Sequence, residues 1–596
     1  SNVPSFRHRE TEATVSQADA PNAAHNGAVR KRLLSRGVDQ STIPLWEASL
    51  AESSSGSGLI HGPFYSTNLL DRKFGGPQSW RCMERFAVWQ QRPNGTWKLR
   101  PCDNAASSLH NDMTSMHETI SCVSAAFPAE VASLFVEALG AGPGWSMAHG
   151  TDDIDSAYRR VPTGHPSYGV VAQLDPKGRV AYFIVPGLNF GLASAVNQFN
   201  RFPSLIVAFM RSVFGVVVAH YFDDYDVCEP TYAGTDGQRL LGEVHAELGI
   251  LLAPGKHVPM AASNVFLGVT SEFGPRFEAE RIVTMSPKPG RVESLTRLLQ
   301  PVVESGSIST VDASSLRGKL MFLLLTSAYG RLGRAPLSAL SEVPSTRARR
   351  THELGASTVM ALQVVLAILP VAPPRAIDLR RAAVSASRPP IVIWTDAMWT
   401  PGATPRGRMG FVVYIPPGRD PAYPEGRYLY SSLDADEAIL SRMDYRETYI
   451  GQLELLAAIL VYASLPALLH GEYVLHFIDN TSALAGLIAG SSKVPDSARI
   501  IHAFQVLNLS IMAVPWFAYV ASKANISDLP SRAAFAEMAA AIRELQPGFC
   551  LTRDWVDPVL PAIPESWAAY AVSVFGESPA PPRQRKARRQ KRTRVH

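Results

Sequence analysis

Residues 216–229, VVVAHYFDDYDVCE, place two adjacent aspartates directly after an apolar run. The residues before Asp223 are typical of a buried strand and those after Asp224 of a return strand, so we expect the pair at the tip of a hairpin. Adjacent carboxylates repel each other unless a cation lies between them or both are solvated in a turn. This stretch leaves both interpretations open.

Length and composition predict several folded domains in a reducing compartment. The chain has 596 residues, too many for one core, and its 46% hydrophobic and 18% charged residues are ordinary for a globular protein. The five cysteines form no Cys-x-x-Cys pair, which predicts neither a zinc module nor a disulfide framework. We therefore expect a cytoplasmic or nuclear protein that is not secreted.

No stretch predicts a membrane span or a signal peptide. Of the two longest apolar stretches, 204–220 is interrupted by Arg211 and 455–469 is too short to cross a bilayer. The N-terminus has no basic flank followed by an apolar segment. Because the chain begins with Ser rather than Met, we expect a piece of a longer product.

Positive charge is concentrated at the C-terminus. Residues 583–596, RQRKARRQKRTRVH, carry eight Lys or Arg and no acid, and removing these eight charges takes the formal net charge from +5 to −3. This segment predicts attraction to polyanions such as nucleic acid. A nuclear-localisation segment and a solvated disordered end are the alternatives.

Changes of pattern along the chain predict its domain organisation. The N-terminal segment is rich in small and polar residues, which predicts disorder apart from a short helix at VRKRLLSR. Short strand-like runs then alternate with helical patterns, and a helical stretch and a Pro-rich linker precede a second α/β pattern. The expected segments are a disordered N-terminal segment (1–60), a first domain (61–285), a helical segment (286–370), a linker (371–390), a second α/β unit (391–535), a C-terminal extension (536–575) and a basic disordered tail (576–596).

Two motifs precede the paired aspartates. TDDIDSAYRRVP (151–162) contains Asp153, and VPGLNFGLASAVNQF (185–199) has a Phe-Gly turn that leads into a helix-like stretch. Asp153 is a third carboxylate, which the binding of two hard cations such as Mg²⁺ requires. In this order and spacing, the three segments resemble motifs A, B and C of reverse transcriptases.

Three further segments agree with this resemblance. NGTWKLRPCDNAASSLHN (94–111) looks like the fingers motif whose basic residues meet the incoming triphosphate, LGILLAPGKHVP (248–259) resembles motif D, and VFLGVTSE (265–272) resembles the primer grip. The fingers motif and ASKANISDLPSR (521–532) are most similar to tyrosine-recombinase retrotransposons of the DIRS/Ngaro type. The resemblance covers about residues 80–535.

The resemblance implies two-metal nucleotidyl transfer. Asp153 and Asp223 would be the principal ligands of two Mg²⁺ ions, with Asp224 contributing to the field around them and Mn²⁺ as a substitute. Residues from several motifs would bind the nucleotide: Lys98, Arg100, Tyr158, Phe190, Gly191 and Lys256.

The resemblance implies a chemical role for four of these residues. Arg100, together with Lys98, would neutralise the β- and γ-phosphates. Tyr158 would pack under the incoming sugar, where its ring clashes with a 2′-hydroxyl and favours dNTPs over NTPs. Lys256 would protonate the departing pyrophosphate. The alternatives are a solvated surface charge for Lys98 or Lys256 and an ordinary core aromatic for Tyr158.

A second set of carboxylates lies beyond the linker: Asp396, Glu454, Asp479 and Asp528. Asp396 and Asp479 end strand-like runs, and Glu454 lies in the apolar helical segment 447–469 between them. Converging carboxylates without a basic partner destabilise a fold unless metal or water compensates. Glu447, seven residues before Glu454, lies on the same expected helical face and is the alternative to it.

The spacing of this second set resembles the RNase H domain attached to retroelement reverse transcriptases. The resemblance implies hydrolysis of the RNA strand of an RNA–DNA hybrid, with two Mg²⁺ ions bound by the four carboxylates. A helix cap or a turn residue is the alternative for each aspartate alone, and the presence of all four residues in order disfavours it.

Together the resemblances imply an α+β and α/β multidomain fold, a right-hand polymerase with fingers, palm and thumb followed by an RNase H-like α/β domain. The implied function is an RNA-directed DNA polymerase with ribonuclease H activity from a retrotransposon polyprotein. Its partners would be an RNA template, a DNA primer, the RNA–DNA hybrid and dNTPs, with no membrane. A domesticated, non-catalytic nucleic-acid-binding scaffold is the alternative, which the intact carboxylates disfavour, and Tyr158 disfavours an RNA-dependent RNA polymerase.

Overall fold

The structure is a computed structural model that forms two compact units, Ser1–Arg281 and Ile282–His596. Each unit has hydrophobic cores of its own. The basic segment 583–596 lies outside the residues that the structure describes. These described residues are 21–54, 59–91, 96–114, 119–326, 340–341, 343, 350–380, 389–402, 406–419, 422–545 and 553–576.

The expected disorder of residues 1–60 is wrong for the part of that segment that the structure describes. Helices α2 (Asn22–Arg36) and α3 (Thr42–Ser54) form there. Val29 and Leu33 of α2 are buried in a core shared with β5 and β6. Because each helix buries only a narrow apolar side against a sheet, its overall composition resembles that of a disordered segment.

The sheet that these helices pack against has the strand order β1-β6-β5-β2-β3. Its strands, with the helix that follows β1, are β1 His61–Phe64, α4 Thr67–Phe74, β2 Cys82–Gln91, β3 Trp97–Asp103, β5 Val170–Leu174 and β6 Val180–Ile184. β2 and β3 form an antiparallel hairpin, and β2 pairs in parallel with β5. Residues 97–103 of the fingers motif therefore form β3, at the edge of this sheet.

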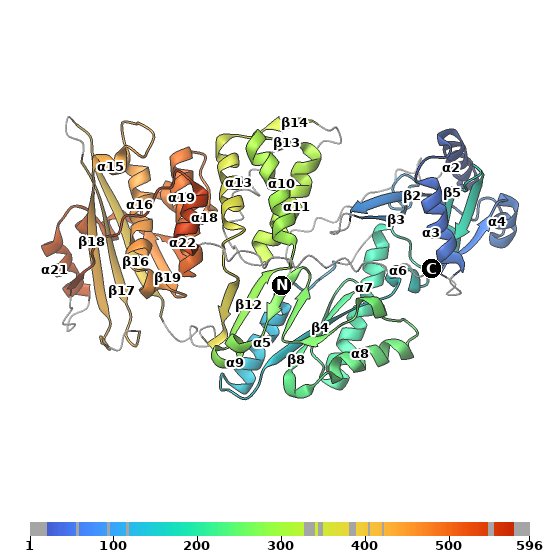
Figure 1. The fold of residues 1–596 in the computed structure, drawn as a ribbon, viewed down its shortest axis with the longest axis horizontal. Helices are drawn as coiled ribbons and strands as arrows, with labels where there is room; N and C mark the ends of the chain where they lie inside the picture. Colours follow the sequence, from blue (N-terminus) through green and yellow to red (C-terminus); the bar gives the residue numbers. More distant parts are fainter. Residues whose placement is uncertain are drawn as a thin grey trace, which may run out of the picture. The chain divides into compact units, whose positions relative to one another are not determined.

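A second sheet of the first unit, with the order β7-β8-β4-β9, carries the paired aspartates. The elements of this part are α5 Phe127–Leu139, β4 Met147–Asp153, α6 Ala157–Arg160, α7 Ala193–Phe209, β7 Val218–Tyr221, β8 Asp224–Pro230, α8 Asp236–Glu247 and β9 Val258–Ala261. Buried residues of β7 and β8 pack with Phe199 of α7 and Leu241 of α8, so these helices cover one face (Figure 1). A hairpin of β10 (Ser263–Phe266) and β11 (Val269–Glu272) and helix α9 (Pro275–Glu280) follow.

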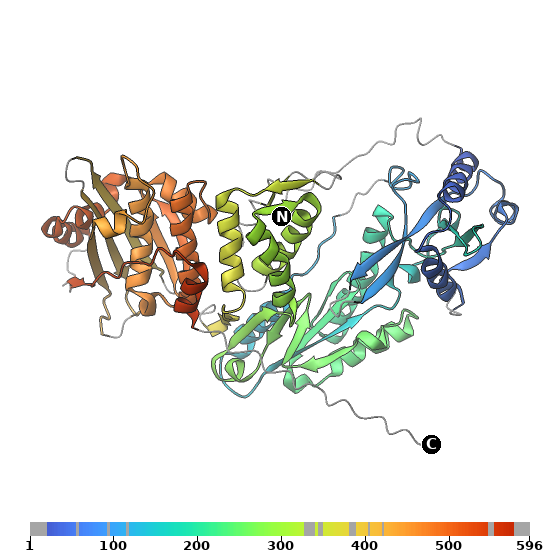
Figure 2. The same cartoon turned by 45° about the horizontal axis from the view of Figure 1, so that its top comes forward.

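The second unit begins with β12 (Ile282–Pro287), which pairs antiparallel with β15 (Arg375–Asp378). Three helices stand side by side around a common core, with the hairpin β13–β14 at one end (Figures 1 and 2). Their bounds are α10 Arg291–Ser305, β13 Ser307–Ser309, α11 Thr310–Thr326, β14 Thr351–Glu353 and α13 Ala356–Ile368. The expected linker, 371–390, thus contains a strand. Backbone hydrogen bonds to β12 hold this strand, and the Pro-rich composition of the segment gives no sign of them.

The last sheet has the order β20-β19-β16-β17-β18-β21. Its strands and helices are β16 Ile391–Thr400, β17 Arg406–Ile415, β18 Arg427–Ala435, α15 Glu437–Leu440, α16 Ile450–Ser464, α17 Pro466–Leu469, β19 Tyr473–Ile478, α18 Thr481–Ala489, α19 Pro495–Ile511, β20 Val514–Tyr519, α20 Asp528–Ser531 and α21 Phe535–Leu545. Helices α16, α18 and α19 cover one face, and α20 and α21 cover the other. Figure 1 shows α21 on the opposite side of the sheet from α16 and α19. Helix α16 is apolar on most sides, apart from the buried Gln452 and Glu454, and lies between the sheet and α19.

The described residues of the expected C-terminal extension, 536–545 and 553–575, are built into this unit. β21 (Arg553–Trp555) adds to the sheet beside β18, and α22 (Trp567–Phe575) packs on α13 and α19. Within the described residues, the helices are all too short or too polar to cross a membrane. The chain is a mixed α+β protein of more than one domain, as the sequence predicts.

Candidate active sites

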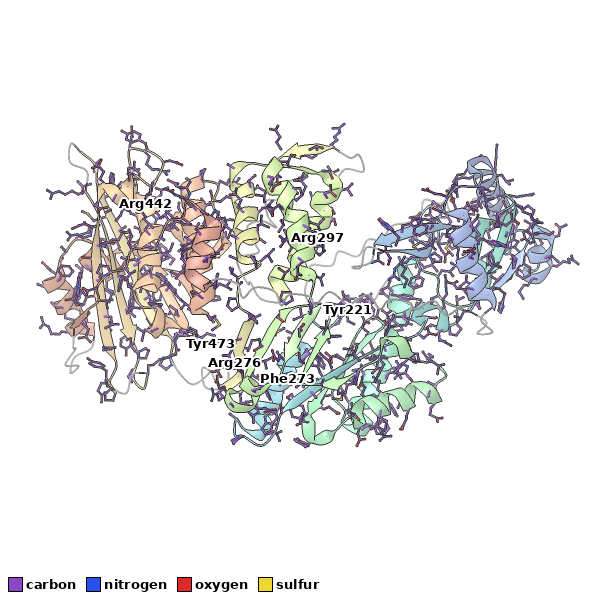
Figure 3. The ribbon with its side chains drawn as sticks, viewed as in Figure 1. Tyr221, Phe273, Arg276, Arg297, Arg442 and Tyr473 are labelled. Atoms are coloured by element: carbon purple, nitrogen blue, oxygen red, sulfur yellow. The ribbon has the colours of Figure 1, made fainter. Side chains whose placement is uncertain are left out.

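The hairpin of β7 and β8 holds the paired aspartates at its tip, as predicted. Tyr221, labelled in Figure 3, ends β7 and pairs with Asp224 at the start of β8, so Phe222 and Asp223 form the turn. Phe222 has a φ of 52°, the left-handed conformation that a two-residue hairpin turn requires. Across the sheet, Asp224 is the register partner of Asp153 at the end of β4. The three carboxylates therefore lie at one end of this sheet.

The aspartates at this end of the sheet repel one another in a half-buried environment. Burial, followed by the negative charges of Asp223 and Asp153, raises the pKa of Asp224 to about 7. Burial also raises the pKa of Asp223, and the charge of Asp153 adds to that rise. A divalent cation would relieve this repulsion, which makes the set a candidate metal site.

Two basic residues of the segment after α8 contact two adjacent aspartates of β4. Lys256 Nζ lies 2.5 Å from Asp153 Oδ1, and His257 Nδ1 lies 2.7 Å from Asp152 Oδ1. The other Asp152 oxygen accepts a hydrogen bond of 2.8 Å from Gln238 of α8. Lys256 is thereby held beside Asp153, although 103 residues separate the two in the sequence.

Tyr158 lies in an aromatic group beside the paired aspartates. Its ring stacks on Phe199 with the centroids 4.6 Å apart and meets Phe190 at 4.9 Å. Burial raises the pKa of Tyr158 to about 12, with the charge of Asp223 as the next cause. Gly191 follows Phe190 with a φ of +100°, and a Cβ there would lie 2.2 Å from the backbone oxygen of Asp103. Only glycine fits this turn.

The two basic residues of the fingers motif project from the same face of β3, because they are two residues apart. Lys98 and Arg100 are both exposed, and Arg100 Nε donates a hydrogen bond of 2.8 Å to Gln90 Oε1. The positive charge of Arg100 opposes the rise in the Asp223 pKa. Arg100 thus lies within electrostatic range of the paired aspartates.

The second carboxylate set converges in the C-terminal α/β part. Thr395 and Ile478 are register partners in the parallel pair β16–β19, which brings Asp396 beside Asp479. Glu454 of α16 completes a group of three residues in which one carboxylate oxygen of each lies within 4.8 Å of the other two. Asp396 lies inside β16 rather than at its end, so the expectation of two strand ends is correct only for Asp479.

Burial makes this group electrostatically unfavourable without a cation. Burial, followed by the negative charges of Asp396 and Asp479, raises the pKa of Glu454 to about 9. Burial likewise raises the pKa of Asp396 to about 7. Within the described part of the chain, Glu454 Oε2 is buried and has no hydrogen-bond partner. Such an oxygen fits a site that binds a metal ion.

Asp528 and Glu447, the two other acids considered for this site, lie outside the group of three. Asp528 begins α20, where its Oδ1 lies 2.8 Å from Nε of Arg532, and its charge contributes to the raised Asp396 pKa. It is thus near the group but also paired with a cation. Glu447 is exposed and precedes α16, which begins at Ile450. The expectation that it shares a helical face with Glu454 is wrong, and the structure favours Glu454.

Two residues to which the sequence alone gave no role, Asn525 and Ser531, support these carboxylates. Ser531 Oγ donates a hydrogen bond of 2.5 Å to Asp396 Oδ2, and Asn525 Nδ2 donates one of 3.1 Å to the backbone of Thr395. Thr395 in turn contacts the buried His476 at 2.9 Å. Both Asn525 and Ser531 belong to the ASKANISDLPSR segment, so their polar character beside Asp528 was the available signal.

Comparisons with known proteins find similar solved structures but no matching protein family. No protein-family model and no curated protein matches the chain. A foamy viral protease-reverse transcriptase, designated dRH and in complex with double-stranded DNA, has a TM-score of 0.38 and 11% identity, covering 82% of this chain and 73% of that one. A foamy viral protease-reverse transcriptase with double-stranded DNA has a TM-score of 0.40 and 12% identity, covering 81% and 84%. These values are too low to assign an activity.

Proposed function

We propose that the chain is an RNA-directed DNA polymerase with ribonuclease H activity, from a retrotransposon polyprotein of the DIRS/Ngaro type. The observation that carries the proposal is the register of Asp153 opposite Asp224, with Tyr158 beside them. Phosphoryl-transfer enzymes hold metal ions with such carboxylates and place the nucleotide next to them. The motif resemblance supports the same assignment.

The acidic residues of both sites suit Mg²⁺ or Mn²⁺, which prefer oxygen ligands. Asp153, Asp223 and Asp224 would hold two ions at the polymerase site. Asp396, Glu454, Asp479 and Asp528 would hold two at the nuclease site. The unpartnered Glu454 Oε2 supports this fit. When bound, the ions lower the pKa of the attacking hydroxyl or water and stabilise the leaving oxygen.

The remaining residues position the substrates, which are dNTPs, an RNA template and a DNA primer. Arg100 and Lys98 project from β3 to neutralise the triphosphate. Tyr158 excludes a ribonucleotide because its ring occupies the space of a 2′-hydroxyl. Lys256 donates a proton to the departing pyrophosphate. At the nuclease site, the substrate is the RNA strand of the RNA–DNA hybrid that polymerisation produces.

Incorporation of dTTP on poly(rA)/oligo(dT) with Mg²⁺ tests the polymerase assignment. We expect the wild type to extend the primer and Asp223→Asn to lose at least about a hundredfold in rate. Asp236→Asn, an exposed aspartate of α8 paired with Arg239, is the matched control and should extend normally. A folded wild type that binds the duplex but extends it with neither Mg²⁺ nor Mn²⁺ would point instead to a non-catalytic scaffold.

A further inference from the structure

A cluster of buried charges lies behind the aromatic group of Tyr158. Asp103, the last residue of β3, and Arg85 of β2 are both fully buried, and Arg85 Nε lies 2.8 Å from Asp103 Oδ1. The other oxygen of Asp103 lies 3.2 Å from Arg159 Nη2. One carboxylate therefore joins two guanidinium groups that come from different parts of the first unit.

The same carboxylate anchors the turn that precedes α7. Asn189 Nδ2 donates a hydrogen bond of 3.2 Å to Asp103 Oδ2. Asn111 adds a second anchor, because its amide donates to the backbone oxygen of Gly191 at 3.0 Å and accepts from the Ala193 N–H at 2.8 Å. Gly191 lies so close to the backbone of Asp103 that the turn has no room to shift toward β3. The fingers strand and this turn are thus locked together.

Arg159 connects the cluster to the residues that we assign to the nucleotide. It follows Tyr158 in α6, and its guanidinium carbon lies 5.6 Å from the centroid of the Phe190 ring. Phe190 in turn meets Tyr158 at 4.9 Å. A shift of Arg159 would therefore displace both aromatic rings.

Helix α3 contributes the opposite edge of the cluster. Glu52 Oε2 lies 3.4 Å from Arg85 Nη1 and 4.0 Å from Arg159 Nε, and Ser49 Oγ accepts from Arg85 Nη1 at 3.1 Å. Burial alone would raise the pKa of Asp103, but the charges of Arg85 and Arg159 outweigh it and hold the pKa below its usual range. Two carboxylates balance two guanidinium groups, which is what makes their burial tolerable.

We propose that this cluster, Glu52, Arg85, Asp103 and Arg159, is a positioning unit that sets the shape of the nucleotide pocket and its preference for deoxyribonucleotides. The inference rests on the proposed polymerase function and extends it, because it makes N-terminal helix α3 part of the pocket's support. Removing one member of a buried, balanced cluster leaves the remaining charges uncompensated, so the arginines must move. Supporting residues of this kind act on substrate binding through the residues they hold.

Steady-state kinetics of Asp103→Asn in the full chain test the inference, with dTTP and with UTP on poly(rA)/oligo(dT). Asn keeps the size of the side chain but removes the charge and directs an amide donor toward Arg159 or Arg85. We expect the KM for dTTP to rise about tenfold with kcat within about threefold, and the preference for dTTP over UTP to fall. Glu52→Gln, at the partly exposed edge, should show the same pattern more weakly.

Glu84→Gln is the matched control, because Glu84 of β2 also pairs with two arginines of an N-terminal helix, Arg32 and Arg36 of α2. It should lower the melting temperature without changing the KM or the preference. An active wild type whose Asp103→Asn and Glu52→Gln variants keep both values overturns the inference alone. If Asp103→Asn does not fold, an unchanged preference in Glu52→Gln overturns it. A wild type that never extends the primer overturns the proposed function and the inference with it.

Discussion

The ammonium group of Lys256 lies 2.5 Å from Oδ1 of Asp153, so the proposed proton donor directly contacts a proposed metal ligand. If Lys256 donates a proton, its removal should slow the chemical step rather than binding. We expect Lys256→Ala and Lys256→Arg each to lower the single-turnover rate about a hundredfold, since arginine keeps the charge but does not release a proton.

Rapid-quench measurement of one dTTP addition checks this prediction. Lys177→Ala, at an exposed lysine of the turn between β5 and β6, is the control and should react at the wild-type rate. A Lys256→Arg variant with an unchanged rate would show that only the positive charge matters.

The buried carboxylates Asp396 and Glu454 of the proposed nuclease site predict a pH-dependent stability. The pKa of Glu454 is raised to about 9 and that of Asp396 to about 7, whereas both carboxyls have pKa values of about 4 in the unfolded chain. Between these limits the folded state binds more protons than the unfolded state, so stability falls as the pH rises.

Thermal unfolding in EDTA at several pH values tests this relation. Glu454→Gln removes the largest raised pKa, so we expect its melting temperature to exceed that of the wild type by a margin that grows from pH 5 to pH 9. Mg²⁺ should reduce the margin by stabilising the wild type at high pH. A margin that does not change with pH would contradict the assignment of Glu454 as a buried, unpaired acid.

Substitutions in the two carboxylate sets should abolish two different activities, each without loss of the other. Asp479→Asn removes an oxygen from the group with Asp396 and Glu454, and we expect it to abolish cleavage of the RNA strand in a labelled hybrid while primer extension persists. Asp223→Asn should show the reverse pattern. Loss of both activities in the folded Asp479→Asn variant would mean that the sets do not form separate sites.

The turn at Gly191 should be intolerant of any side chain. Gly191→Ala combines a left-handed backbone with a contact of 2.2 Å to the Asp103 backbone, whereas Gly215, with a φ of +68°, has open space around it. We expect Gly215→Ala to cost about 1 kcal/mol in the free energy of unfolding and Gly191→Ala clearly more. Denaturant unfolding of both variants measures the difference, and equal losses would contradict it.

Much of both sites follows from short patterns in the sequence. An apolar run followed by Asp223 and Asp224 predicted a hairpin tip, and the structure has the hairpin there. The apolar segment around Glu454 predicted a helix, and α16 forms it. These features depend on residues close together in the chain, whose periodicity and turn preferences the sequence displays directly. The roles of these residues in catalysis remain predictions.

The sequence by itself therefore determined which carboxylates occur, in what order, and on which kind of element each lies. The tertiary structure decided that α16 begins after Glu447, that Asp396 lies within its strand, and that Ser531 contacts it. It also decided that residues 22–36 and 42–54 form helices and that Glu52 reaches the arginines behind Tyr158. The physical reason is range: helix starts, strand register and buried charge pairs are set by packing between segments far apart in the chain, which local patterns do not encode.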